Sequence, residues 1–167
     1  MPEYRPAYVA LGSNLDDPVA QIERATHALA ALPLTRLRRR SQLYANPPMG
    51  PQDQPEYVNA VAALETALAP LALLDALQAI ETEQGRTRSG PRWGARTLDL
   101  DLLLYDDLEW DDPRLTLPHP GLHERDFVLY PLAEIAPQLA IPGREPLVAL
   151  LAQCPSRGLR PLDRADD

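Results

Sequence analysis

The chain has 167 residues, of which 16 are basic and 24 acidic, so its formal net charge is −8. A single domain of this length can bury a sizeable hydrophobic core, and the acidic balance argues against a broad nucleic-acid-binding surface. All 16 basic residues are arginines, so the lysine that a P-loop phosphate site requires is missing, and neither common glycine-rich phosphate motif occurs.

Cysteine content and apolar runs restrict the class of protein further. Cys154 is the only cysteine, which excludes an internal disulfide and fits a reducing compartment. No signal-peptide pattern opens the chain, and no apolar run approaches the ~20 residues that cross a bilayer. We therefore expect a soluble, cytoplasmic protein with no membrane or nucleic-acid partner.

The N-terminal part predicts a strand followed by an amphipathic helix. Residues 8–11 have strand composition and end at a Gly-Ser-Asn turn. Asp17 is a suitable N-cap and Pro18 suits the first helical position, so we expect a helix that runs to Pro33. The predicted buried stripe of this helix consists of Val19, Ile22, Leu29 and Leu32.

The middle of the chain predicts two strands, a long loop and a second helix. Residues 34–44 are mostly polar, which favours an edge strand. Residues 45–56 contain four prolines and a glycine, which is typical of a functional loop. Residues 57–64 form the next expected strand. A second helix opens at Pro70, and Gly85 suits its C-terminal cap.

The remaining segments predict a further strand and several short elements. A second long loop, residues 86–97, precedes a strand that starts near Asp99 and ends at a turn over Asp106 and Asp107. The expected C-terminal elements are a weak strand, a kinked helix and a short helix, at residues 115–117, 127–135 and 146–154.

The order of these elements predicts the fold class. It runs strand, helix, strand, strand, helix, strand, which is the α+β, ferredoxin-like βαββαβ pattern with an antiparallel sheet. Extra C-terminal elements follow it, and the two long loops are expected to cover an active site. We expect a single domain over residues 1–162 and a frayed tail over residues 163–167.

Two aspartates separated by one leucine carry the strongest chemical signal. Because side chains on a strand alternate between faces, Asp99 and Asp101 point the same way, with Cα atoms ~6.6 Å apart. Such a pair suits a hard cation such as Mg²⁺, which takes oxygen ligands. A solvated surface pair is the alternative. It is disfavoured because the strand continues as a leucine run, where unpaired carboxylates are costly.

An arginine-rich loop lies directly before this pair. Within the eleven residues 86–96 there are four arginines and no acid: Arg86, Arg88, Arg92 and Arg96. Arginine forks bind phosphate oxygens in pairs, and neighbouring glycines let such a loop close over a ligand. A solvated, salt-bridged loop is the alternative, but the adjacent carboxylates favour a polyphosphate site.

Other residues leave a functional and a structural interpretation open. Trp93 either stacks on a flat ligand or anchors the loop, and Phe127, the only phenylalanine, is by default a core residue. His119 and His123 have the spacing of zinc ligands on a helix. The proline and glycine between them disfavour a helix, so we expect a phosphate contact at His119 instead of a zinc site.

The motifs together resemble the 6-hydroxymethyl-7,8-dihydropterin pyrophosphokinase family of folate biosynthesis. The likeness covers nearly the whole chain and rests on Gly12-Ser13-Asn14, residues 47–52 (PPMGPQ), Tyr57-Val58-Asn59, residues 92–101 (RWGARTLDLD) and Pro118-His119-Pro120. That family's ferredoxin-like fold agrees with the order of elements. The resemblance implies that ATP gives its terminal diphosphate to the hydroxymethyl group of the dihydropterin and releases AMP.

The resemblance also implies roles for individual residues. Catalytic roles are implied for Arg86, Arg92, Asp99 and Asp101, and the last two would hold two Mg²⁺ ions. Contacts with ATP are implied for Gln78, Glu81, Arg88, Arg92, Arg96, Arg114, Thr116, His119 and Arg125. Contacts with the pterin are implied for Asn46, Pro47, Met49, Tyr57, Asn59, Trp93 and Phe127. Position 46 departs from the family pattern, which has threonine or serine there.

The resemblance implies ATP as co-substrate, small-molecule substrates only, and a monomer. Two other functions use similar residues. A metal-dependent phosphodiesterase or sugar-nucleotide transferase would use the acid pair without an aromatic slot. A ligand-sensing ferredoxin-like module would bind small molecules without metal dependence or turnover. The combination of Tyr57, Asn59 and Phe127 favours the pterin enzyme over the first of these, because hydrolysis needs no aromatic slot.

Overall fold

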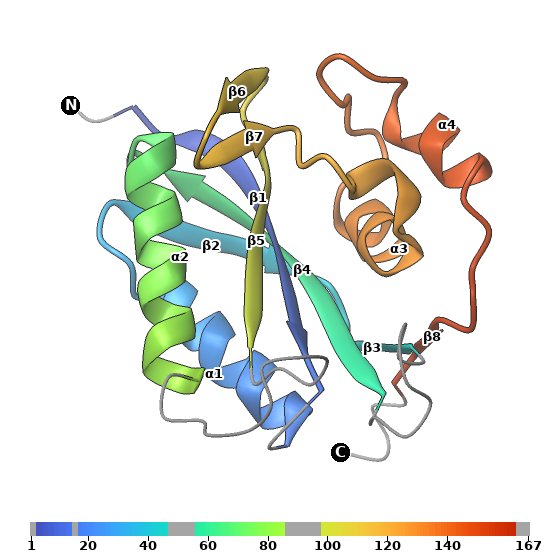
Figure 1. The fold of residues 1–167 in the computed structure, drawn as a ribbon, viewed down its shortest axis with the longest axis horizontal. Coiled ribbons are helices and arrows are strands. Elements are labelled where there is room, and N and C mark those ends of the chain that lie inside the picture. The colour runs from blue at the N-terminus through green and yellow to red at the C-terminus, as the bar shows by residue number, and fades with distance from the viewer. Residues whose placement is uncertain (1–2, 15–16, 47–55, 86–97, 163–167) are drawn as a thin grey trace.

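The computed structural model describes residues 3–14, 17–46, 56–85 and 98–162. The described part forms an antiparallel sheet with helices on both faces (Figure 1). In chain order the elements are β1 (Arg5–Ser13), α1 (Pro18–Ala30), β2 (Thr35–Arg40), β3 (Tyr44–Asn46), β4 (Tyr57–Thr66), α2 (Pro70–Gly85), β5 (Asp99–Tyr105), β6 (Trp110–Asp112), β7 (Leu115–Leu117), the 3₁₀ turn η1 (Leu122–Glu124), α3 (Asp126–Ile135), α4 (Leu147–Ala152) and β8 (Arg160–Pro161).

The sheet topology confirms the predicted fold class. The strand order is β5-β1-β4-β3-β8, β2 also pairs with β4, and every pairing is antiparallel. If β2 and β3 are counted as one interrupted strand, the first four strands have the order of a ferredoxin-like βαββαβ sheet. The two sequence-distant strands β1 and β5 therefore lie side by side, which brings the N-terminal strand next to the aspartate pair.

The expected edge strand over residues 34–44 is instead two strands. A register irregularity falls between Leu37 and Arg39, and regular pairing stops at Arg40. Ser41 keeps the interruption tied to β4, because its N–H donates to Val61 O at 2.9 Å and its Oγ accepts from Val61 N at 3.0 Å. Of these two strands, only β2 lies at an edge of the sheet, since β8 pairs with β3.

The first helix begins as predicted but buries a different stripe. The Asp17 side chain accepts from Ala20 N at 3.4 Å, and Pro18 occupies the first turn. Ile22 and Leu29 are fully buried, whereas Val19 is 36% exposed, so its predicted place in the core is wrong. Gln21 is buried instead, because Gln84 Nε2 on α2 donates to both its backbone and its side-chain oxygen.

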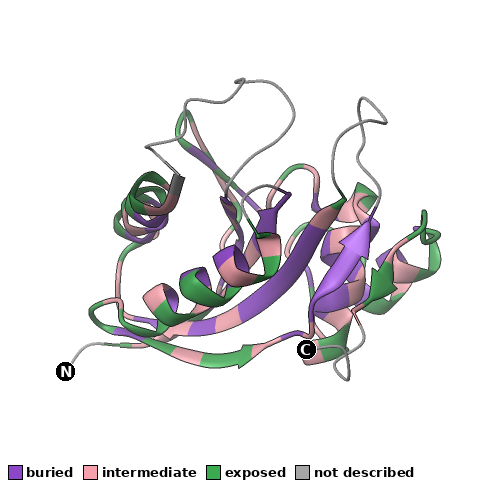
Figure 2. Ribbon diagram, turned by 90° about the horizontal axis from the view of Figure 1, so that it is seen from below, coloured by how far each residue is buried: buried purple, intermediate pink, exposed green. Residues whose placement is uncertain are grey.

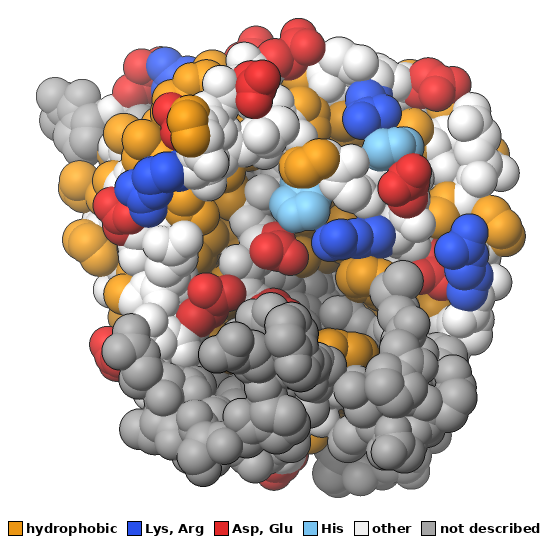
Figure 3. Space-filling view, in the orientation of Figure 1, with side chains coloured by type: hydrophobic (Ala, Val, Ile, Leu, Met, Phe, Trp, Pro, Cys, Tyr) orange, Lys and Arg blue, Asp and Glu red, His pale blue; other side chains and the backbone are white. Residues whose placement is uncertain are grey.

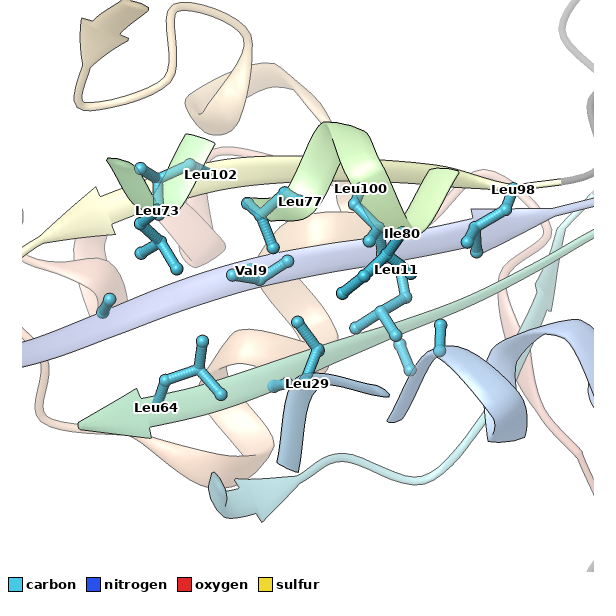
Figure 4. Close-up of a cluster of buried hydrophobic side chains, with 14 of the residues drawn as sticks. Val9, Leu11, Leu29, Leu64, Leu73, Leu77, Ile80, Leu98, Leu100 and Leu102 are labelled. Atoms are coloured by element: carbon cyan, nitrogen blue, oxygen red, sulfur yellow. The ribbon is translucent and has the colours of Figure 1, made fainter. Parts of the chain in front are cut away.

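One hydrophobic core fills the space between the sheet and the helices α1 and α2. Side chains from β1, β4, β5 and the two helices converge there (Figure 4). On β5 the residues Leu98, Leu100 and Leu102 face this core. Both helices turn their buried residues toward the sheet and their exposed residues outward (Figure 2). Alternation along β5 consequently sends Asp99 and Asp101 to the opposite face.

A second core lies on that opposite face, under α3 and α4. It includes Val61 from β4 together with Leu103 and Leu104 from β5. Two consecutive leucines share one face because the β1–β5 register shifts between Tyr8 and Val9, which leaves Leu103 without a partner. The helix α3 contains Pro131, in agreement with the predicted kinked helix.

The end of the described chain is attached to the sheet. Leu162 N donates to Leu43 O at 2.9 Å, so the last described residue is held against the sheet. The predicted tail, residues 163–167, lies outside the described residues. Among the helices that are described, none combines the length and the apolar character needed to span a membrane.

Candidate active site

A row of paired residues crosses the sheet on the face toward α3. Gly12 on β1 pairs with Asp99 on one side and with Asn59 on the other, and Asn59 pairs with Tyr44. Directly paired residues on antiparallel strands point to the same face. Asp99 and Asn59 are two strands apart, which is about 10 Å between their backbones. The side chains of the acid pair and of Asn59 therefore lie near each other on the same face of the sheet.

The two aspartates share one face of β5, as the sequence predicts. Both are half-buried, whereas Leu98, Leu100 and Leu102 between and beside them are buried in the first core. Within the residues that the structure describes, no group of three or more histidine, cysteine or acidic side chains forms a metal site. Among the described residues, Asp99 and Asp101 would be the acidic ligands of a cation bound there. Oxygens of the substrate and water would complete its coordination.

A cleft of about 580 Å³ follows the outer edge of β5. Acidic, basic and histidine side chains border a hollow near the centre of the face seen in Figure 3. The cleft collects eight of the predicted site residues: Gln78, Glu81, Asp99, Asp101, Arg114, Thr116, His119 and Arg125. Leu74 and Leu115 add apolar surface. The cleft is thus one polar site with an apolar part. It is built by residues from α2, β5, the β6–β7 hairpin and the segment before α3.

Glu81 connects α2 to the strand that carries the aspartates. Its Oε2 accepts from Leu100 N at 2.7 Å. Because β5 is the last strand of the sheet, this N–H has no neighbouring strand to donate to. One carboxylate oxygen of Glu81 thereby positions β5. The residue is also predicted to contact the nucleotide.

Arg114 extends from the β6–β7 hairpin across the cleft to α2. Its Nη2 donates to Asp75 Oδ1 at 2.6 Å and to Gln78 Oε1 at 3.4 Å. Its backbone N–H donates to Asp112 Oδ1 at 2.9 Å, which stabilises the hairpin turn. The contact joins two predicted nucleotide-binding residues at one end of the cleft.

His119 is held rigidly and is kept neutral. Its backbone N–H donates to Leu103 O at 2.9 Å, and its Nδ1 accepts from Gly121 N at 3.0 Å. In the neutral ring the proton therefore sits on Nε2, which can donate to a ligand. Burial lowers the pKa of His119 below its ordinary 6.5, the Asp101 carboxylate opposes this shift, and the Arg125 guanidinium adds to it.

Arg125 lies at the junction of the cleft and α3. Its guanidinium lies above the Phe127 ring, with Cζ 5.9 Å from the ring centroid. A Cβ at Gly121 would lie 2.9 Å from Arg125 Nε, so a larger residue there would displace the guanidinium group from this position. Arg125 makes no ion pair with any described carboxylate. An unpaired arginine in a cleft is available to a phosphate.

The predicted pterin-side residues lie next to the cleft without lining it. Asn59 and Asn46 are both buried, and Asn59 Nδ2 donates to Asn46 Oδ1. Tyr57 pairs with Asn46 at the start of β4, and Phe127 is half-buried in the first turn of α3. The asparagine at position 46, which departs from the family pattern, thus orients the Asn59 amide.

Seven predicted site residues cannot be placed. Arg86, Arg88, Arg92, Trp93 and Arg96 of the arginine-rich loop, and Pro47 and Met49 of the proline-rich loop, lie outside the described residues. Their implied roles stay predictions.

Two residues of the site were not predicted from the sequence. Asp75 holds Arg114 at the cleft, and Asp112 lines the cleft and accepts from the Arg114 backbone. Asp75 lies three residues before Gln78, which lies three residues before Glu81, so helical spacing was a signal for a shared polar face. For Asp112 the sequence contained no signal, because its position depends on the β6–β7 hairpin. Of this hairpin, only the second strand, at residues 115–117, was predicted.

Comparison with known proteins decides the family. The family described as 7,8-dihydro-6-hydroxymethylpterin-pyrophosphokinase matches residues 8–137. The chain belongs to this family. It is 57% identical over 158 residues to a 2-amino-4-hydroxy-6-hydroxymethyldihydropteridine pyrophosphokinase of Pseudomonas aeruginosa, covering 95% of this chain and 97% of that protein. A pyrophosphokinase of the same description from Haemophilus influenzae is 53% identical over 147 residues, covering 88% and 91%.

A solved structure agrees with the pyrophosphokinase fold. The crystal structure of Plasmodium falciparum HPPK-DHPS wild type with pteroate has a TM-score of 0.70 and 14% sequence identity to this chain. The match covers 90% of this chain and 42% of the longer Plasmodium chain, so this protein corresponds to less than half of it. At this identity the likeness supports the fold alone, and it agrees with the ferredoxin-like prediction.

Proposed function

We propose that this protein transfers the terminal diphosphate of ATP to the hydroxymethyl group of 6-hydroxymethyl-7,8-dihydropterin and releases AMP. The observation that carries the proposal is the cleft along β5, where the half-buried carboxylate pair meets Arg114, His119 and Arg125. Family membership supports the same reaction. In it the alcohol oxygen bonds to the β-phosphorus, the bond from that phosphorus to the α,β-bridging oxygen breaks, and the hydroxyl proton is released.

The donor set at the carboxylate pair fits Mg²⁺. Asp99 and Asp101 supply hard oxygen ligands on one face of a rigid strand, and Mg²⁺ in proteins is commonly held by one or two carboxylates together with substrate phosphates and water. Bound there, Mg²⁺ would neutralise phosphate charge and lower the pKa of a coordinated alcohol. We propose two ions per site. Activity measured against free Mg²⁺ in the presence of a fixed ATP concentration would show a second-order dependence if both are needed.

The side chains of the cleft have separate tasks in this proposal. His119 donates a hydrogen bond from Nε2 to a phosphate oxygen without adding charge, because burial keeps it neutral. Arg125 supplies a full positive charge to the polyphosphate. Arg114, held by Asp75, orients the nucleotide at the α2 end of the cleft. Positioning and charge stabilisation of this kind are what phosphoryl transfer requires of a protein.

The neighbouring row of residues suits a flat heterocycle. Asn59, oriented by Asn46, presents an amide to a hydrogen-bonding ring edge, and Tyr57 and Phe127 offer aromatic faces. We propose that the pterin lies between these rings. Stacking of a flat base on an aromatic side chain contributes roughly 1–3 kcal/mol by analogy with nucleic acids.

The direct test is incubation with ATP, Mg²⁺ and hydroxymethyl-dihydropterin. We expect AMP to appear in equal amount to the diphosphorylated pterin and only when the pterin is present. Formation of AMP without pterin would indicate a phosphodiesterase, and ADP would indicate ordinary kinase chemistry. Binding without turnover would favour a ligand-sensing module.

Replacement of the carboxylates tests the metal role. Asp99→Asn and Asp101→Asn should each reduce kcat by about 10³-fold, because a bound metal contributes several kcal/mol of charge stabilisation. The thermal midpoint should change little, since both side chains are half-buried at the cleft and outside both cores. Asp107→Asn, at an exposed position in the turn after β5, is the matched control and should keep full activity.

The remaining partner assignments are also proposals. We propose a monomer that binds small molecules and no nucleic acid, with the negative net charge as the supporting observation. Sedimentation at several protein concentrations would test the first point and a filter-binding assay with DNA the second. A cytoplasmic location stays a prediction, which fractionation of cells would test.

A further inference from the structure

A second cavity lies on the other side of Arg125 from the cleft. It has a volume of about 640 Å³ and lies between η1, the start of α3, α4 and the segment after α4. Its volume is in the range of small-molecule sites. Basic, acidic and histidine side chains lie close together on this side of the molecule, over α3 and α4 (Figure 3).

Three arginines line this second cavity, Arg125, Arg144 and Arg157. None of them forms an ion pair with a carboxylate of the described residues. Elsewhere in the described chain, six of the eight arginines form an ion pair with an acid within 4 Å, as Arg40 and Arg160 do. The lining also includes Glu124 and Glu145, so the three guanidinium groups outnumber the carboxylates that line the cavity.

The acids that line the cavity already have other partners. Glu124 lies 3.7 Å from His123 Nε2, and Glu145 accepts from Gln153 Nε2 at 3.0 Å. Asp126, beside the cavity, accepts from the Arg157 backbone N–H at 2.6 Å. These acids keep their charge, but none of them lies within 4.0 Å of a guanidinium nitrogen of the three arginines.

A buried polar atom without a partner belongs to a residue that lines this cavity. Nδ1 of His123 is buried and has no hydrogen-bond partner in the described part of the chain. An unsatisfied buried nitrogen costs free energy unless something occupies the space next to it. His123 lines the cavity together with the arginines, and a rotation of its ring that exposes Nδ1 to the cavity would let an oxygen of a ligand satisfy this nitrogen.

We propose that this cavity binds a phosphate group, separately from the nucleotide cleft. Arginine forks match tetrahedral phosphate oxygens, and the buried Leu150 and Cys154 provide an apolar floor for the rest of a phosphate ester. Arg125 lines both cavities, so a phosphate here draws on the same guanidinium as the nucleotide. The site itself does not depend on the proposed transfer reaction.

The three histidines of the chain allow a direct binding test by NMR of the imidazole signals. His123 reports on the second cavity, His119 on the cleft, and His27 on the exposed side of α1. Titration of the full chain with inorganic phosphate at constant ionic strength should shift the His123 signal along a saturating curve and leave His27 unchanged. A His123 signal that follows ionic strength alone, or that moves only with His119 at one shared affinity, would overturn the proposal.

Variants and a second probe sharpen the test. Arg144→Gln and Arg157→Gln should each weaken phosphate binding at His123 by tenfold or more, while Arg24→Gln, an exposed arginine on α1, should not. Equal affinity for inorganic phosphate in all three variants would overturn the proposed site. Phenyl phosphate distinguishes a phosphate ester from the free ion. Tighter binding than inorganic phosphate supports the apolar floor, and equal or weaker binding overturns that part.

A kinetic measurement tests the sharing of Arg125, and this part rests on the proposed function. With free Mg²⁺ held constant, inorganic phosphate should raise the KM for ATP more in the unmodified protein and in Arg24→Gln than in Arg144→Gln. Identical inhibition in all three would overturn the sharing. If no transfer activity is found at all, the NMR titration still decides whether the second site exists.

Discussion

At the residue scale, Gly12 controls how Asn59 lies on the sheet. A Cβ at position 12 would lie 2.9 Å from Asn59 Oδ1, which is closer than real Cβ contacts allow. Asn59 in turn donates to Asn46, so the two amides and the glycine form one arrangement. The glycine of the Gly-Ser-Asn turn is therefore needed for close approach of the pterin-side amide.

Gly12→Ala should disturb the pterin side selectively. The added methyl group displaces the Asn59 amide, so we expect the KM for the dihydropterin to rise about tenfold, equivalent to about 1.4 kcal/mol. Steady-state kinetics with each substrate varied in turn would measure it. The KM for ATP is the internal control and should stay within twofold. An equal rise in both constants would point to general distortion of the sheet instead.

At the element scale, two contacts hold the site elements against the sheet. Glu81 ties α2 to the free edge of β5 through the Leu100 N–H. Tyr44 ties β3 to α3, because its hydroxyl donates to Glu134 Oε1 at 2.7 Å, and Gln42 N also donates to Glu134 at 2.9 Å. Each contact positions an element that carries predicted substrate-binding residues.

Loss of the Glu81 contact should destabilise the β5 edge. Glu81→Ala removes the acceptor of a partly buried backbone N–H, so the free energy of unfolding should fall by about 1–3 kcal/mol in urea denaturation. Glu83→Ala, an exposed position on the same helix, should change it by less than about 0.5 kcal/mol. Hydrogen exchange at the Leu100 amide should accelerate only in the Glu81 variant, and unchanged exchange there would contradict this role.

The Tyr44 contact predicts a stability change at alkaline pH. Burial, with the hydrogen bond to Glu134, raises the pKa of Tyr44 from 10.0 to about 12. Because the folded-state pKa lies above the unfolded value, the stabilisation is complete below pH 10 and is lost as pH rises toward 12. Thermal midpoints of the unmodified protein and Tyr44→Phe should therefore converge as pH rises from 10 toward 12. A constant difference across this range would show that the hydroxyl does not contribute in this way.

At the scale of the whole molecule, the C-terminal segment closes the sheet. β8 pairs with β3, Leu162 donates to Leu43, and Arg160 forms an ion pair with Glu56 at 2.7 Å (Figure 1). The segment thereby covers the strand that carries Asn46, although it follows that strand by more than a hundred residues.

Truncation at two points tests where the domain ends. A chain that stops at Gly158 loses the β8 pairing and the Leu162 hydrogen bond, so we expect a loss of about 1–2 kcal/mol and a thermal midpoint lower by about 4 °C. A chain that stops at Leu162 is the matched control and should unfold within about 1 °C of the full chain. An equal loss in both would contradict the predicted boundary at residue 162.

Local features of the site and the order of the elements follow from residues that are neighbours in the chain. Alternation along a strand places Asp99 and Asp101 on one face whatever surrounds them, and Asp17 with Pro18 specifies a helix start within a few residues. The family pattern added a prediction of the substrates. These inferences succeed because they depend on residues that are close in the chain.

Contacts between segments that are distant in the chain became visible only in the folded structure. The cleft joins α2 to β5 and to the residues before α3, Arg125 lies between two cavities, and β8 covers β3. The exposure of Val19 and the division of the expected edge strand are of the same kind. Each depends on which distant surfaces pack together, and local propensity and periodicity carry no information about such long-range contacts.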